Sequence, residues 1–127
     1  MYNDKVMEIF KTAKNAGMVK CANGVGVAGN AKCGDIMKLY IKVDENEVIQ
    51  EAKFKTFGCV AAIASTDVAC DLIKGKTIKQ AGEVTNQDVA KVLGDIPPVK
   101  MHCSVLAQEV IGSAIADYRK KQAKLKK

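Results

Sequence analysis

The chain has 127 residues, a formal net charge of +6 and five cysteines. A chain of this length forms one domain and buries about two-thirds of the surface that its unfolded form exposes, so disulfides are not needed to hold it together. An odd number of cysteines without a secretory leader favours a reducing compartment, and we expect the cytoplasm. No apolar run approaches the ~20 residues of a membrane-spanning helix, so we expect no membrane segment.

The positive charge is concentrated near the carboxyl terminus. Six basic residues lie between Arg119 and Lys127, which equals the whole net charge and leaves the rest of the chain near neutral. Cations at the end of a helix are stabilised by its dipole and keep a terminus solvated. Aromatic residues are few and tryptophan is absent. We therefore interpret residues from about 119 as a basic tail and expect no nucleic-acid partner.

Hydrophobic spacing predicts a helix at the start of the chain, followed by a pair of strands. Apolar residues recur at helical spacing from Val6 to Ala13, and the helix should stop by Gly17. Residues 36–43 alternate apolar and polar side chains, and residues 48–57 do so again after an acidic turn. These two segments form an antiparallel pair with one wet face, and helices must cover the other face.

The second half of the chain is predicted to be helical. An apolar segment runs from Cys59 to Lys74 and is stopped by Gly75, and Thr77 and Thr85 each begin a short helix. After Pro97-Pro98, a long terminal helix has a buried stripe of Cys103, Leu106, Val110, Ile111, Ala114, Ile115 and Tyr118. The order predicts an α+β fold in a single domain over residues 1–127, in which helices pack on one face of a small antiparallel sheet.

Three cysteines lie in settings that expose and activate a thiol: Cys33 beside Lys32, Cys59 after Gly58, and Cys103 after His102. They are 26 and 44 residues apart, whereas zinc fingers pair their cysteines two to four positions apart. The fold must therefore bring these ligands together. Cys59 and Cys103 fall at helix starts, where free N–H groups and the helix dipole stabilise a thiolate.

Asp35 and His102 add an oxygen and a nitrogen to the three thiols. This donor set suits an iron-sulfur cluster or zinc and suits calcium or magnesium poorly. Each residue also has an ordinary structural interpretation. A single cysteine is most often a small buried hydrophobe, Asp35 could cap a turn, and a carbonyl could satisfy His102.

Two further cysteines and one glycine motif are not assigned to the site. Cys70 lies about 16 Å along a helix from Cys59, too far to share a small cluster, and Cys21 has no ligand neighbour. Residues 24–29 fit the G-x-G-x-x-G dinucleotide pattern, but no strand precedes them and no helix follows. We expect these glycines to provide flexibility near the metal site.

Three segments together resemble the iron-sulfur cluster assembly scaffold proteins, the IscU family and the amino-terminal domain of NifU. They are Cys33-Gly34-Asp35-Ile36-Met37-Lys38, Phe57-Gly58-Cys59 with the alanine-rich segment after it, and Pro97-Pro98-Val99-Lys100-Met101-His102-Cys103-Ser104. The resemblance covers about Lys5 to Tyr118. It implies a sheet of about three strands, the third coming from around Val25 to Ala28, and a scaffold rather than a turnover enzyme.

The resemblance also implies a role for each site residue. Cys33, Cys59 and Cys103 would be the ligand cysteines, with Cys103 the persulfide acceptor. Asp35 would match the family aspartate linked to cluster lability, and His102 a histidine that can ligate. The scaffold would receive sulfur from a cysteine desulfurase, assemble a labile [2Fe-2S] cluster with ferrous iron, and pass it to apo iron-sulfur proteins. It would be a monomer or a weak homo-oligomer, and zinc could occupy the same groups.

The segment Ile96-Pro97-Pro98-Val99-Lys100 resembles the one that a specialised Hsp70 chaperone, with its J-type co-chaperone, recognises in this family. Two prolines fix an extended peptide that suits binding, and they also simply separate two helices. One departure concerns Ala13, where the family often has proline, so the first helix could run longer. Two other classes remain open: a structural zinc domain that binds a partner, and a thiol redox sensor.

Overall fold

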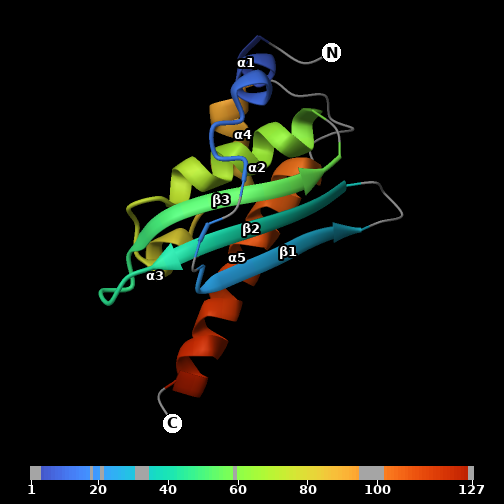
Figure 1. Cartoon of the computed structure of the whole chain (residues 1–127). Coiled ribbons are helices and arrows are strands. Elements are labelled where there is room, and N and C mark those ends of the chain that lie inside the picture. The colour runs from blue at the N-terminus through green and yellow to red at the C-terminus, as the bar shows by residue number, and fades with distance from the viewer. Residues whose placement is uncertain are drawn as a thin grey trace.

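The computed structural model describes residues 4–17, 19–20, 22–30, 35–58, 60–94 and 102–125, and the side chains of 7–17, 19–20, 22–29, 36–58, 62–94 and 105–122. In chain order the elements are α1 (Asp4–Thr12), β1 (Gly24–Asn30), β2 (Asp35–Val43), β3 (Ile49–Phe57), α2 (Val60–Ile73), α3 (Ile78–Ala81), α4 (Asn86–Leu93) and α5 (His102–Leu125). Figure 1 shows the sheet with α2 and α5 behind it. The predicted α+β class is confirmed, including the third strand.

The sheet has the order β1-β2-β3, and both pairings are antiparallel. Leu39 in the central strand lies opposite Gly26 of β1 and Phe54 of β3. The alternation expected from the sequence is observed, because Met37 and Leu39 are fully buried whereas Lys38 between them is exposed. One face of the sheet therefore packs on the helices and the other carries most of the polar side chains.

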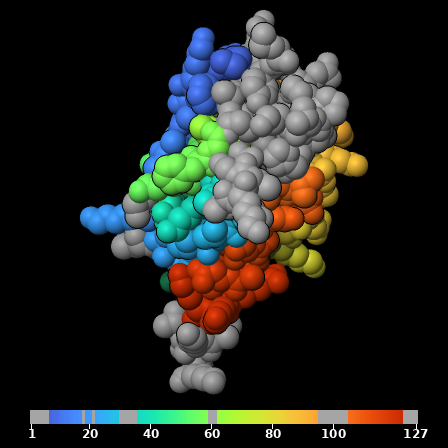
Figure 2. Space-filling model, turned by 90° about the vertical axis from the view of Figure 1, so that its right-hand side faces the viewer, coloured from blue at the N-terminus to red at the C-terminus, as the bar shows by residue number. Residues whose placement is uncertain are grey.

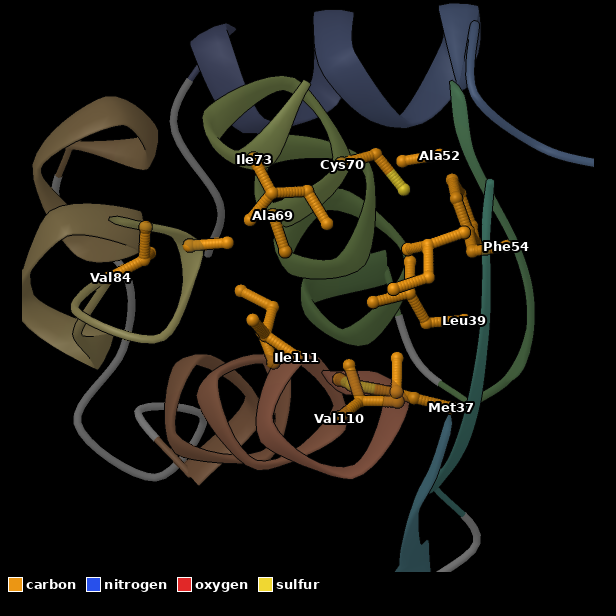
Figure 3. Packing of buried hydrophobic residues seen from close by; sticks show 14 of the residues in the cluster. Met37, Leu39, Ala52, Phe54, Ala69, Cys70, Ile73, Val84, Val110 and Ile111 are labelled. Atoms are coloured by element: carbon orange, nitrogen blue, oxygen red, sulfur yellow. The ribbon is translucent and has the colours of Figure 1, made fainter. Parts of the chain in front are cut away.

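The hydrophobic core lies between the inner face of the sheet and the helices. Figure 3 shows Leu39 and Phe54 from the strands facing Cys70 of α2, with Ile111 of α5 below them. Each of these side chains is at most 2% exposed. Burial of a large aliphatic or aromatic side chain contributes about 1.5–3 kcal/mol, so this layer is the main source of stability.

The glycines of β1 allow α5 to approach the sheet closely. A Cβ atom on Gly26 would lie 2.4 Å from the Ala114 nitrogen and 2.5 Å from the Val110 carbonyl oxygen, closer than real contacts allow. The expectation that this glycine segment provides flexibility is therefore wrong for residues 24–30, which form a strand. As expected, residues 24–29 do not form a dinucleotide-binding loop, because they lie within that strand instead of between a strand and a helix.

The first helix ends at Thr12, so it does not run longer in the absence of proline. Ala13 has a φ of 37°, which stops the helix and is a conformation that proline cannot adopt. The chain then pairs with the edge of β3. The Phe54 amide donates to the Asn15 carbonyl at 3.0 Å, and the Gly17 amide donates to the Phe54 carbonyl at 2.8 Å. From there it crosses the outer face of the sheet to β1 (Figure 1).

The two short helices begin as the sequence predicts. Thr77 and Thr85 each accept a hydrogen bond from the backbone three residues on, and the side chains of Gln80 and Asp88 bond back to the cap residue. These capping boxes satisfy N–H groups that a helix start otherwise leaves free. Within the ranges given above, no helix is long and apolar enough to cross a membrane.

Candidate metal centre

Three strand ends meet at one end of the sheet, which we call the ligand end. Asn30, the last residue of β1, pairs with Asp35, the first of β2, and Ile36 pairs with Phe57, the last of β3. Helix α2 begins at Val60, only three residues after Phe57. Antiparallel pairing thus brings the last residue of β1 and the first residues of β2 next to the end of β3, which leads within three residues to α2. Figure 2 looks onto this end of the molecule.

Helix α5 runs antiparallel to β1 and begins at the ligand end. The Val25 amide donates to Asp117 Oδ2 at 2.8 Å, and the Val27 amide donates to Ser113 Oγ at 3.1 Å, so helix numbers fall as strand numbers rise. About 16 Å of helix separates Ser113 from His102, whereas about 10 Å of strand separates Val27 from Asn30. The start of α5 therefore lies beyond the end of β1, on the side where β2 begins.

The predicted ligands are attached to these converging ends. Cys33 and Cys59 lie outside the described residues, as does the whole segment Ile96-Pro97-Pro98-Val99-Lys100. Asp35 is the first residue of β2, and His102 and Cys103 are the first two of α5, but their side chains are outside the described set. What the structure brings together are the described elements that flank them in the sequence: Cys33 is two residues before β2, and Cys59 directly precedes α2.

Cys70 is excluded from the ligand end by burial. Its side chain is fully buried on α2, and desolvation, with Asp67 as a lesser cause, raises the pKa of the thiol far above its ordinary value. A thiol in such surroundings stays protonated, whereas a metal ligand must be a thiolate. The prediction that Cys70 is a core residue agrees with this placement, and Cys21 lies outside the described residues.

Two carboxylates of α2, Asp67 and Asp71, bind the segment that follows α1. The Asn15 backbone amide donates to Asp67 Oδ1 at 2.9 Å, and its side chain donates to the Asp67 carbonyl and to Asp71. Asp67 is 3% exposed, and desolvation by burial raises the pKa of its carboxyl. Considering only side chains that the structure describes, no three His, Cys, Asp or Glu groups lie close enough to hold a metal ion.

Sequence reasoning missed a pair of threonines beside the ligand end. Thr56, the residue before Phe57 in β3, donates its hydroxyl to that of Thr66 in α2 at 3.2 Å, and Thr66 donates to the Ala62 carbonyl at 2.7 Å. Phe57 is 75% exposed at the same end, and Val105 in α5 is 42% exposed. A threonine in an alternating strand is ordinary, so only the tertiary contact with α2 distinguishes Thr56.

Comparison with known proteins places this arrangement in a family. The model of the NifU-like N-terminal domain matches residues 1–125. One of the two IscU iron-sulfur cluster assembly scaffold proteins of Archaeoglobus fulgidus is 48% identical over 127 residues, which is 100% of this chain and 82% of the relative. The IscU scaffold protein of Haemophilus influenzae is 46% identical over 124 residues, covering 95% of this chain and 98% of the relative.

Solved structures share the fold. A Fervidobacterium islandicum protein, assigned as an iron-sulfur cluster assembly scaffold of the SUF system, matches with a TM-score of 0.73 and 27% identity over 90% of this chain and 96% of its own. A NifU-like amino-terminal protein of Brucella abortus matches with a TM-score of 0.71 at 18% identity, a likeness of fold alone, over 94% of each chain. The family match over nearly all residues, with relatives close to half identical, shows that this chain belongs to the NifU-like N-terminal domain family.

Proposed function

We propose that this protein is a scaffold on which a labile [2Fe-2S] cluster is assembled and from which it is passed to apo iron-sulfur proteins. The observation that carries the proposal is the convergence, at the ligand end, of the backbone flanking Cys33, Cys59 and Cys103. The curated relatives named as cluster assembly scaffolds support it. The cluster is cargo in this scheme, so a site with three thiols and two weaker donors suits its later release.

The sulfur would arrive as a persulfide on a cysteine desulfurase. The Cys103 thiolate attacks the outer sulfur of that persulfide, the enzyme's thiolate leaves, and Cys103 becomes the persulfide. Each transferred sulfur takes up two electrons, which breaks its bond to the Cys103 sulfur and releases it as sulfide to bridge the iron bound by the other ligands. For a [2Fe-2S] cluster in its oxidised, diferric form, the two ferrous ions supply two of these four electrons and an external reductant supplies the other two. The start of α5 favours the thiolate form of Cys103, because the helix dipole and free N–H groups stabilise negative charge there.

Anaerobic reconstitution tests the proposal. The full chain is incubated with ferrous iron, cysteine, a desulfurase and a reductant, and absorption and circular dichroism spectra are recorded. We expect the spectrum of a [2Fe-2S] cluster, followed by its appearance on an added apo-ferredoxin within minutes. A chain that gains no cluster under these conditions, while a known scaffold in parallel does, contradicts the proposal.

Cysteine substitutions test the ligand assignment within that assay. Cys33→Ala, Cys59→Ala and Cys103→Ala should each abolish stable assembly, because a small cluster cannot be held with a thiolate missing. Asp35→Ala should instead make the cluster longer-lived, as expected for a residue that promotes lability. Equal loss of assembly from Cys70→Ala would overturn the assignment.

One partner and one compartment accompany the proposed scaffold role. We assign Ile96-Pro97-Pro98-Val99-Lys100 as a segment recognised by an Hsp70 chaperone with its J-type co-chaperone, and the cytoplasm as the compartment. A fluorescent peptide of residues 95–101 should bind such a chaperone, and replacing both prolines with glycine should weaken binding by raising the entropy of the free peptide.

A further inference from the structure

A cavity lies at the end of the sheet opposite the ligand end, where β2 finishes at Val43. The turn from β2 to β3 forms one wall and the carboxyl-terminal half of α5 forms the other, around a volume of about 570 Å³. We call it the hairpin pocket. Its lining includes Val43, Asp44, Glu45 and Glu47 from the first wall and Tyr118 and Arg119 from the second. The residues that line it include none of the predicted metal ligands, so the scaffold role leaves this pocket unexplained.

Hydrogen bonds fix the wall that the turn provides. Asp44 Oδ1 accepts from the backbone amides of Asn46 at 2.8 Å and Val48 at 3.0 Å, and Oδ2 accepts from the Gln50 side chain at 2.6 Å. These bonds, the one from Val48 foremost, lower the pKa of the Asp44 carboxyl, so it is ionised at neutral pH. A ligand therefore meets a wall that does not need to be ordered on binding.

The hairpin pocket has an excess of negative charge. Among the residues that line it, the carboxylates of Asp44, Glu45 and Glu47 stand against the single guanidinium of Arg119. Glu45 and Glu47 are exposed, and neither forms an ion pair with a residue that the structure describes. Exposed carboxylates attract cations only weakly by themselves. The charge therefore sets the sign of a ligand but does not define a site without a further contact.

Tyr118 supplies that contact, because it is a buried polar residue without a partner. Its side chain is 5% exposed, and its hydroxyl makes no hydrogen bond with the described part of the chain. Desolvation raises the pKa of the phenol, and the charges of Glu47 and Asp44 raise it further. Both of these carboxylates line the hairpin pocket, so the hydroxyl lies on the pocket side of the ring. Buried tyrosine hydroxyls usually have a partner, and a ligand in the pocket would provide one.

We propose that the hairpin pocket binds a small organic amine, whose ammonium group lies between the carboxylates of the turn and the Tyr118 hydroxyl. An ammonium group has three N–H donors and no acceptor, which matches one phenol oxygen and two free carboxylates. Val43 and the Tyr118 ring offer apolar surface to the carbon chain of the amine. The volume is within the range of small-molecule sites. This inference goes beyond the scaffold role and does not depend on it.

A nuclear magnetic resonance titration of the full-length, reduced, metal-free protein tests the inference. Isotopically labelled protein at neutral pH and physiological salt receives butylamine, γ-aminobutyrate or butanoate, which carry the ammonium group, both charges or the carboxylate alone. We expect both amines to shift the amide signals of residues 44–47 and 118–122 and to saturate at about 1 mM. Butanoate should shift neither set. An equal response to butanoate, or no saturable response to either amine at these residues, overturns the inference.

Substitutions in the pocket test the contacts. Tyr118→Phe keeps the ring and removes the hydroxyl, so butylamine should bind about tenfold more weakly, as for a lost hydrogen bond to a charged group. Glu47→Gln should weaken binding about two- to fivefold. The matched control is Glu51→Gln, which removes the same charge from an exposed position of β3 outside the pocket lining and should leave the affinity nearly unchanged. Equal weakening in Glu51→Gln and Glu47→Gln, or unchanged binding in Tyr118→Phe, contradicts the site.

Arg119→Gln separates two sources of the ammonium group. Loss of the like charge should tighten the binding of butylamine severalfold. If the carboxylate of γ-aminobutyrate pairs with Arg119, the same variant should weaken the binding of that probe, and this result assigns the pocket to amino-acid zwitterions. Tightening with both probes assigns it to simple amines, and either result supports the ammonium site. Iron, sulfide and a desulfurase are not added, so failure of the scaffold role leaves this test unaffected.

Discussion

At the scale of single residues, burial separates cysteines that share the same chemistry. Cys70 contacts the sheet from within α2 and is fully removed from water, so its thiol behaves as a small hydrophobe. The predicted ligands Cys59 and Cys103, by contrast, stand at the starts of α2 and α5 in the sequence, and the first N–H groups of a helix have no partner within it. Position in an element, rather than residue type, therefore decides which thiol can be reactive.

Cys70→Ala tests this distinction. We expect a loss of about 1–2 kcal/mol in the free energy of unfolding, because a buried sulfur is replaced by a small void. Urea denaturation measures this loss. Zinc or iron uptake by the variant should equal that of the wild type, and reduced uptake would show that Cys70 contributes to binding.

Asp67 should make stability depend on pH. Asp67 lines a cavity of about 300 Å³ together with Glu8, Lys14 and Asp71. The Asn15 backbone amide donates to the Asp67 carboxylate. Burial raises the folded-state pKa of Asp67 above 3.8, so between 3.8 and that raised pKa the folded state binds more protons than the unfolded state. This group's contribution to stability is therefore complete below pH 3.8 and is lost as pH rises through the folded pKa.

Asp67→Asn removes that titration and can still accept from the Asn15 amide. We expect the difference in unfolding free energy between variant and wild type to shift in favour of the variant as pH rises from 3.5 to 7. Denaturant titrations at several pH values measure this difference. A constant difference across the range would show that the carboxyl is not desolvated as its burial indicates.

At the scale of elements, the contact between β1 and α5 fixes where the last helix begins. Two strand amides bond to α5 side chains, and the absence of Cβ atoms at Gly24 and Gly26 lets the helix backbone approach. These bonds also occupy amides that an edge strand would otherwise leave free. The position of His102 at the ligand end follows from this packing.

Gly26→Ala and Gly112→Ala form a matched pair for this contact. The first places a methyl group 2.4 Å from the Ala114 nitrogen, so α5 must move and stability should fall by about 1–3 kcal/mol or more. The second adds a methyl where nothing lies within 4 Å, on a helix, and should stabilise by about 1 kcal/mol. Thermal unfolding followed by circular dichroism measures both, and equal effects would contradict the close approach.

At the scale of the whole molecule, the core extends well beyond the ligand end. The buried cluster is formed by strands and helices along the whole inner face of the sheet, from Met37 near the ligand end to Val43 and Ile49 at the other end. A structural zinc domain would depend on metal for folding, and a scaffold with this core should not.

Metal removal distinguishes these two classes. After treatment with a chelator, we expect the far-ultraviolet circular dichroism spectrum and cooperative unfolding to persist, with a modest fall in melting temperature from the loss of ligand binding. Bound zinc should exchange within minutes. Collapse of the secondary structure on chelation would favour the structural zinc domain instead.

The sequence predicted most elements because each depends on local patterns. Alternation at residues 36–43 and 48–57, the capping boxes of Thr77 and Thr85, and the apolar stripe of the terminal helix all led to elements that are observed. Two features could not be predicted in this way: that the glycine-rich residues 24–30 form a strand packed on α5, and that α1 ends at Thr12. The first depends on a helix nearly 90 residues away in the chain, and the second on a positive φ at Ala13.

The sequence by itself determined the family and the fold class, because motif spacing and hydrophobic periodicity depend on residues that are close together in the chain. The residues that could bind metal stay a prediction from those motifs. Only the tertiary structure decided which segments meet. Antiparallel register aligns Asp35 with the end of β1 and Ile36 with Phe57, and α5 starts beside them because it packs along β1. The Thr56–Thr66 contact likewise exists only once α2 lies on the sheet, since two hydroxyls ten residues apart cannot meet until the turn has folded.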